Sequence, residues 1–228
     1  MSKPKVVHHE FDKDQYYPNV TEKSQIFLHH TVSGVGVAGD INWWEQTPEH
    51  VATCVIIARD GTIHTLYRSE VWAHHLGVKI KHFDKYGVER KFRKSVKSGK
   101  MFVSNNVELN EGSIGLELDS WGGLTKKGSK FYGGSKEIPI ENVVDYGKKI
   151  RGFQYYEKYT TEQIRSLIYL CKYWNDKYKI PIHYRPEMWE ISVEALRGTA
   201  GLWAHVSVRP DKSDCHPQPE LIEALKAL

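Results

Sequence analysis

The stretch that decides the fold is Ile26-Phe27-Leu28-His29-His30-Thr31. Three large apolar residues in a row predict a strand that is buried on both faces. Two histidines follow at once, and Ser33-Gly34-Val35-Gly36 then allows the chain to turn away. A strand that ends in histidines holds metal-binding side chains on a rigid base. We therefore interpret His29 as the first ligand of a zinc site; the alternative is a pair of histidines that only ends a strand.

The composition predicts a globular protein. The chain has 228 residues, of which 40% are hydrophobic and 12% aromatic, enough to bury the core of one large domain. No stretch is long and apolar enough to span a membrane, and the polar residues after Met1 contain no apolar signal region. We therefore expect synthesis in the cytoplasm without a cleaved leader. The three cysteines are odd in number and far apart, so no disulfide framework is expected.

The net charge of +4 is unevenly distributed along the chain. Residues 79–100 hold nine Lys or Arg against two acidic residues, a local net charge of +7, which leaves −3 for the remainder. Such a run is typical of a solvated loop, whereas a functional run attracts a polyanion such as a cell-wall polymer or nucleic acid. No nucleic-acid-binding motif accompanies it, so we expect no nucleic-acid partner.

We predict a single α/β domain with a mixed central sheet flanked by helices and a zinc cleft at one end of the sheet. Strands are expected at 25–30, 51–57, from Gly61 to about Tyr67, 113–119 and 201–205, and helices near 41–44, at 161–178 and from Pro219 onward. Asp60-Gly61 predicts an antiparallel hairpin. Residues 79–106 and 122–134 are expected to be irregular loops, and residues 1–23 an arm that packs on the domain.

For two of these elements the sequence pattern also predicts which way particular side chains face. The helix at 161–178 begins with a capping box of Thr160 and Gln163, and its apolar stripe includes Cys171, which we assign to the core. In the strand at 113–119, apolar residues alternate, so Glu117 is expected on the face opposite to them.

The segment from His205 to Pro217 concentrates an imidazole, a lysine, a carboxylate and a thiol within a few residues. A catalytic zinc ion takes three protein ligands and keeps one position open for water. His29, His205 and either Asp214 or Cys215 would supply that set.

Together, these motifs resemble the zinc-dependent N-acetylmuramoyl-L-alanine amidases of phages and bacteria, whose fold is shared with animal peptidoglycan recognition proteins. The matching segments are the strand ending at His29, Val51–Gly61, Trp72–Gly77, Asn110, Ser113–Glu117, Tyr159–Tyr178 and His205–Pro217. The resemblance implies that residues 24–228 form an amidase catalytic domain.

The resemblance implies a zinc cofactor held by His29 and His205. For the third ligand it leaves two rivals. Asp214 follows Lys212 at the family's usual spacing, whereas Cys215 lies ten residues after His205, and zinc favours a thiolate on softness. The lysine spacing makes Asp214 the favoured of the two.

The resemblance also implies roles around the metal. Glu117 matches the catalytic glutamate, which takes a proton from a zinc-activated water, and Lys212 would stabilise the oxyanion. Thr53 stands on the substrate side where some members carry a tyrosine, so more of the chemistry falls on Glu117. His75 is expected to contact substrate or oxyanion, and Trp72 to lie at the cleft with the other aromatic residues Trp43, Trp44 and Trp121.

The activity implied is hydrolysis of the amide between N-acetylmuramic acid and the L-alanine of the stem peptide, with peptidoglycan as partner and a monomer as the expected state. We expect a phage endolysin that reaches the bacterial wall through a holin-type pore, with a recycling amidase or a virion lysin as other settings. The alternative of another class is a non-catalytic recognition protein that binds peptidoglycan without cutting it.

Overall fold

In the computed structural model, which describes residues 3–48, 50–88, 94–97, 100–103 and 107–228, Gln25–His30 forms strand β2 of a six-stranded central sheet. The order across this sheet is β1 (Val6–His8), β4 (Ile63–Thr65), β3 (Val55–Ile57), β7 (Ser113–Leu118), β2 and β13 (Gly201–Ala204). Strand β2 pairs in parallel with both β7 and β13, whereas β3 and β4 pair antiparallel. The predicted mixed central sheet is confirmed, and β1 from the predicted arm supplies one of its edges.

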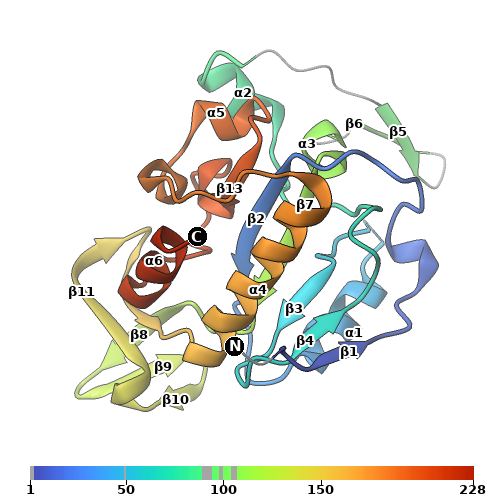
Figure 1. Cartoon of the computed structure of the whole chain (residues 1–228). Helices are drawn as coiled ribbons and strands as arrows, with labels where there is room; N and C mark the ends of the chain where they lie inside the picture. Colours follow the sequence, from blue (N-terminus) through green and yellow to red (C-terminus); the bar gives the residue numbers. More distant parts are fainter. Residues whose placement is uncertain (1–2, 49, 89–93, 98–99, 104–106) are drawn as a thin grey trace.

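The apolar run of β2 has the burial that its composition predicts. All six of its residues are buried, because the parallel strands on either side are covered on both faces. Helix α4 (Thr161–Tyr178) crosses the front of the sheet in Figure 1, and Leu167, Cys171 and Trp174 join the main core there. Its capping box of Thr160 and Gln163 is present as predicted.

The opposite face of the central sheet is covered in part by α1 (Ala38–Gln46), whose Ile41 and Trp44 pack with Ile56 of β3. The remaining helices are α2 (Ile80–Lys85), α3 (Val107–Glu111), α5 (Val193–Leu196) and α6 (Pro219–Lys226), with short 3₁₀ turns at Lys13–Gln15, Ile140–Asn142, Pro186–Trp189 and His205–Ser207. Among the residues described, no helix is both long and apolar enough to cross a membrane.

A second, five-stranded sheet, here called the accessory sheet, lies beside α6 in Figure 1. Its antiparallel order is β10 (Lys136–Ile138), β9 (Lys130–Gly133), β8 (Gly123–Lys127), β12 (Phe153–Glu157) and β11 (Val143–Ile150). The expectation of an irregular loop at 122–134 is therefore wrong. The glycines serve a tight turn at Gly128 and close packing at Gly133, where an added Cβ would lie 2.2 Å from the Trp121 ring.

The stretch 79–106 is also more regular than expected. It contains α2, whose Phe83 is buried, and an antiparallel pair of β5 (Lys94–Lys97) and β6 (Lys100–Val103). An apolar anchor within the charged run explains the helix, and the prediction of little regular structure is wrong for the part described. The charged side chains of 89–106 lie outside the described residues.

The Asp60-Gly61 hairpin is confirmed, since Asp60 accepts a hydrogen bond from the Thr62 amide and Gly61 has a φ of +82°. The preceding strand is shorter than predicted. Only Val55–Ile57 forms a ladder, and Val51 makes an isolated bridge to His74. The three cysteines are free and buried, in agreement with the absence of a disulfide framework.

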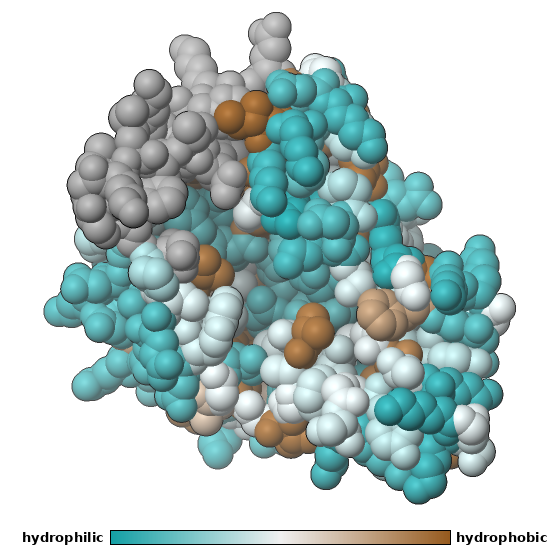
Figure 2. All heavy atoms as spheres, turned by 180° about the vertical axis from the view of Figure 1, so that it is seen from behind, coloured by the Kyte–Doolittle hydropathy of each residue, from teal (hydrophilic) through white to brown (hydrophobic). Residues whose placement is uncertain are grey.

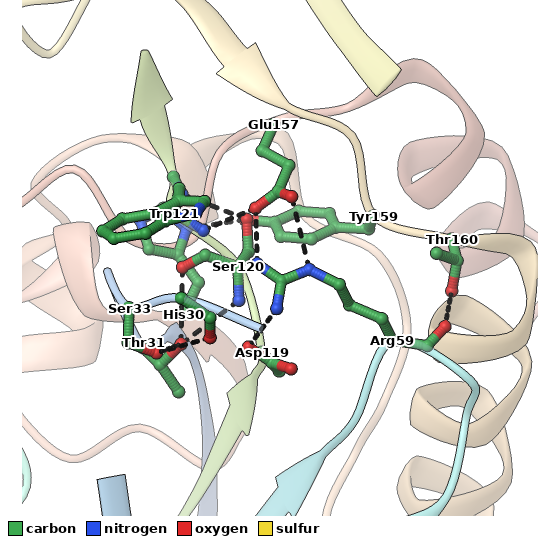
Figure 3. A network of polar contacts seen from close by, with 12 residues as sticks. His30, Thr31, Ser33, Arg59, Asp119, Ser120, Trp121, Glu157, Tyr159 and Thr160 are labelled. Carbon is green, nitrogen blue, oxygen red and sulfur yellow. Dashed lines mark hydrogen bonds and ion pairs between the residues drawn. The ribbon is translucent and has the colours of Figure 1, made fainter. Parts of the chain in front are cut away.

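A buried ion-pair network ties the accessory sheet to the central sheet (Figure 3). The Arg59 guanidinium, just after β3, contacts Asp119 at 2.5 Å and Glu157 of β12 at 2.8 Å. The Trp121 amide donates to the same Glu157 carboxylate at 2.6 Å, and the Gly36 amide donates to Asp119. These contacts fix the loop after β2 and the accessory sheet around the carboxyl ends of β3 and β7.

Candidate metal centre

Two histidines meet because parallel strands end at the same edge of the central sheet. Leu28 of β2 pairs with Ala204 of β13, so His29 and His205 lie side by side. Their Nδ1 atoms are 3.0 Å apart. The loop that carries Asp214 is held to this edge by a hydrogen bond from the Val206 amide to the Asp214 carbonyl.

The Asp214 carboxylate completes the cluster. Its Oδ2 lies 2.7 Å from His205 Nδ1 and 3.2 Å from His29 Nδ1. All three side chains are buried, and among the described residues they are the one group of three whose donor atoms lie close enough together to hold a metal ion. Three donors that converge on one point from two strand ends and one loop form a preorganised site.

The electrostatics of the cluster suit a cation. Burial, followed by the nearby His205, lowers the pKa of His29 to about 4, so its imidazole is neutral at pH 7. Burial alone would raise the pKa of Asp214, but the charge and hydrogen bonds of His205 and His29 in their protonated forms hold this pKa well below its usual range. Two imidazole nitrogens and a carboxylate oxygen are ligands that zinc accepts, and the ligands must be deprotonated to bind.

Cys215 points away from this cluster. Its thiol donates to the Tyr159 hydroxyl at 2.8 Å, and burial raises its pKa. His30 reaches the same hydroxyl at 2.8 Å from the face of β2 that is turned toward α4, which agrees with its predicted place opposite His29 (Figure 3). The geometry therefore favours Asp214 over Cys215 as the third ligand.

Glu117 faces the cluster from β7, where it is the register partner of His29. The residue is 9% exposed, and within the described part of the chain Oε2 is buried without a hydrogen-bond partner. Burial, then Asp214 and Asp40, raise the pKa of Glu117 well above its usual range, while Lys212 opposes the shift. A buried carboxylate oxygen without a protein partner is costly unless a proton, a water molecule or a ligand satisfies it.

His29 and Glu117 share the face of the sheet that is turned away from α4, since they are register partners and His30 contacts the opposite side. Figure 2 views the molecule from that side and shows a hollow near its centre with a hydrophilic floor. Lys212 lies two residues before Asp214, is partly exposed, and is close enough for its charge to act on Glu117.

The predicted substrate contacts are held within the protein. His75 is brought to the site, but its Nδ1 lies 3.0 Å from His29 Nε2 and its Nε2 lies 2.9 Å from Ser113 Oγ, so both ring nitrogens are engaged. The buried Thr53 hydroxyl donates to the Val55 carbonyl.

Of the predicted cleft tryptophans, Trp72 donates its indole N–H to Asn19 at 3.0 Å and stacks on Tyr17 at 4.0 Å between ring centroids. Trp44 belongs to the core cluster under α1, whereas Trp43 is 59% exposed. Trp72 and Trp44 thus pack against the chain's own residues.

Sequence reasoning missed Asp40 on α1. Burial raises the pKa of this carboxyl to about 6 although Ser33 donates a hydrogen bond to it at 3.0 Å. Its charge also acts on Glu117. Its position directly before the apolar Ile41 was the feature of the sequence that could have indicated a partly buried carboxyl group.

The sequence model that describes N-acetylmuramoyl-L-alanine amidases matches residues 19–217. No curated protein matches the chain.

Among solved structures, that of PlyL superposes with a TM-score of 0.52 at 12% identity over 99% of this chain and 98% of that one, which shows a shared fold. The amidase LysC from Clostridium intestinale (14% identity, TM-score 0.47, 99% and 97% covered) and the Ph2119 endolysin from a Thermus scotoductus bacteriophage (10%, 0.48, 97% and 99%) are also similar. Because the family match spans nearly the whole chain, this protein belongs to the N-acetylmuramoyl-L-alanine amidase family.

Proposed function

We propose that the protein is a zinc-dependent amidase that hydrolyses the bond between the lactyl group of N-acetylmuramic acid and the L-alanine of the stem peptide. The observation that carries the proposal is the convergence of His29 Nδ1, His205 Nδ1 and Asp214 Oδ2 next to a buried carboxylate. These three residues would hold the metal. Zinc bound there would supply Lewis acidity, which polarises a carbonyl and makes a water molecule more acidic.

Glu117 is the proposed general base. Its unpartnered Oε2 can accept the proton of the attacking water and return it to the leaving amine of alanine. The raised pKa of Glu117 suits this exchange, because a carboxyl group that is easily protonated can also act as the acid in the second half of the reaction. A cation at the histidine–aspartate cluster would counteract the shift and keep the base ionised before the attack.

Lys212 is the proposed oxyanion contact. Lys212 is partly exposed and its charge acts on Glu117, which supports a place for its ammonium beside the reacting carbonyl. A fixed positive charge near the developing oxyanion stabilises the tetrahedral state more than the ground state. Exchange of Lys212 for Met should lower kcat with little change in zinc content.

The direct test incubates the zinc-loaded protein with purified peptidoglycan and labels newly formed amino termini. We expect alanine amino termini and free stem peptides from the wild type, none from Glu117→Ala, and wild-type release from Glu141→Gln, an exposed glutamate on the accessory sheet side. Zinc binding without alanine amino termini on any wall type would instead indicate a recognition protein. Undiminished activity of Glu117→Ala would remove Glu117 from the mechanism.

For the biological setting we propose lysis of the bacterial wall by a phage endolysin that reaches it through a holin-type pore. The support is the net charge of +7 at residues 79–100, which favours an intact anionic wall over small soluble fragments. Competition between whole sacculi and soluble muramyl peptides tests this setting. A preference for the soluble fragments would point to a recycling amidase.

A further inference from the structure

The two imidazoles of the metal centre turn their outer nitrogens toward fixed partners. His205 Nε2 lies 2.9 Å from the Leu76 carbonyl, which can only accept a hydrogen bond. The proton of a neutral His205 is therefore on Nε2, and the lone pair of Nδ1 faces Asp214. His29 Nε2, by contrast, meets another histidine, His75, whose own tautomer must be decided first.

Ser113 decides the tautomer of His75. The Ser113 hydroxyl donates to the Leu109 carbonyl, so its oxygen is left to accept from His75 Nε2 at 2.9 Å. A neutral His75 then has its lone pair on Nδ1, which accepts the Nε2 proton of His29 at 3.0 Å. The lone pair of His29 is thereby placed on Nδ1, the atom that faces His205 and Asp214.

The backbone around His75 is also fixed by hydrogen bonds. The Asn110 side-chain oxygen accepts hydrogen bonds from the amides of both His75 and Leu76, at 3.0 and 3.1 Å. Room for the imidazole comes from Gly115, because a Cβ at that position would lie 2.9 Å from the His75 ring. One short segment, 107–115, thus supplies the Asn110 side chain that fixes the backbone, the Ser113 oxygen that accepts the His75 proton, and the space at Gly115.

We propose that Ser113, acting through His75, is a positioning residue that holds His29 in the tautomer whose Nδ1 can bind zinc. The proposal rests on the proposed function for the identity of the metal, but the direction of the hydrogen bonds holds in the metal-free protein as well. Neither Ser113 nor His75 needs to touch substrate. This differs from the substrate contact that the resemblance implied for His75.

The first experiment compares Ser113→Ala with Ser166→Ala. Both serines are 3% exposed and donate to a backbone carbonyl, but Ser166 lies on α4 and bonds Gly61, away from the metal centre. Zinc affinity is measured by competition with a chromogenic chelator. We expect Ser113→Ala to weaken zinc binding about 10- to 100-fold, the usual effect of losing an outer partner of a ligand, and Ser166→Ala to leave it within about twofold.

A double-mutant cycle and a spectrum guard against a general loss of structure. His75→Phe keeps a ring and removes both nitrogens, so Ser113→Ala should change zinc affinity by less than about twofold in that background. Long-range ¹⁵N–¹H correlation spectra of the metal-free wild type should show His29 and His75 with the proton on Nε2, and Ser113→Ala should lose this single tautomer for His75.

The inference would be overturned if Ser113→Ala bound zinc with wild-type affinity. It would also be overturned if Ser113→Ala changed zinc affinity equally in the wild type and in His75→Phe, or if the spectra placed the His75 proton on Nδ1. Failure of the proposed function is separate, because it appears as wild-type protein that binds no zinc or releases no alanine amino termini. The spectra of the metal-free protein do not depend on that result.

Discussion

Glu117 and His29 face each other as register partners across the parallel pair of β7 and β2. The pairing places a buried carboxylate beside the proposed metal ligands without any contribution from a loop. Strands hold side chains more firmly than loops do, so the separation of base and metal is set by the sheet itself. Because this carboxylate is buried and its Oε2 has no protein partner, we expect it to support activity at the expense of stability.

Glu117→Gln should remove turnover and stabilise the zinc-free protein. Glutamine cannot take a proton from water, so we expect a loss of kcat of about 10²–10⁴-fold. The pKa of Glu117 is raised in the folded state, so stability of the wild type falls as pH rises above the ordinary glutamate value. The variant lacks this loss and should gain about 1–3 kcal/mol at pH 7. Thermal melts of the wild type and of Glu117→Gln at pH 4 and 7 measure this gain. Equal melting temperatures of the two proteins at pH 7 would contradict the role of burial.

Asp214→Ala and Cys215→Ala should separate the two rivals for the third ligand. The Asp214 carboxylate lies within hydrogen-bond distance of both histidines, whereas the Cys215 thiol is bonded to Tyr159 on the other side of the loop. We expect Asp214→Ala to lose bound zinc and Cys215→Ala to retain it, as measured by metal analysis after dialysis. Loss of zinc only in Cys215→Ala would require the loop to rearrange on binding.

The elements predicted from sequence are those whose signal is local. The apolar run of β2, the Asp60-Gly61 turn and the capping box of Thr160 all act within a few residues, and each is present where expected. The accessory sheet gave no such signal. Its small core is one residue from each of three short strands, Leu124, Phe131 and Ile138, and exposed lysines separate them.

The site shows the same division. Residue types and order indicate His29, His205 and Glu117, because family spacing and strand alternation suffice to place them. The choice between Asp214 and Cys215 depends on the path of a loop, which adjacent residues do not encode. The engagement of His75 depends on Ser113, 38 residues further along the chain, so only the tertiary structure reveals it.

Arg59→Met should destabilise the protein strongly. The Arg59 guanidinium compensates the buried carboxylates of Asp119 and Glu157, and its removal leaves both charges unpaired between the two sheets (Figure 3). We expect a loss of about 3–5 kcal/mol in the free energy of unfolding. Lys130→Met is the control, since its pair with Glu137 is more than half exposed on the lysine side and its loss should leave the free energy of unfolding nearly unchanged. Denaturant titrations of both variants measure the difference; equal losses would contradict the clamping role of Arg59.

Asp40→Asn should make the protein more stable at neutral pH but not at pH 4. The pKa of Asp40 is about 6 in the folded protein, above the ordinary value of 3.8, mainly because of burial. Between these values the native state holds more protons than the unfolded state, so wild-type stability falls as pH rises and stays lower above pH 6. Asparagine cannot ionise and keeps an acceptor for Ser33.

The gain of Asp40→Asn should therefore be near zero at pH 4, grow up to about pH 6.5 and then level off. Because Asp40 is partly exposed, solvent screening reduces the gain to about 1 kcal/mol. Asp145→Asn provides a control of opposite sign, since hydrogen bonds from Gln154 and Gly147 lower the pKa of Asp145. Relative to the wild type, Asp145→Asn should become slightly less stable as pH rises. If the difference in unfolding free energy from the wild type followed pH in the same way for both variants, burial would not be the cause at Asp40.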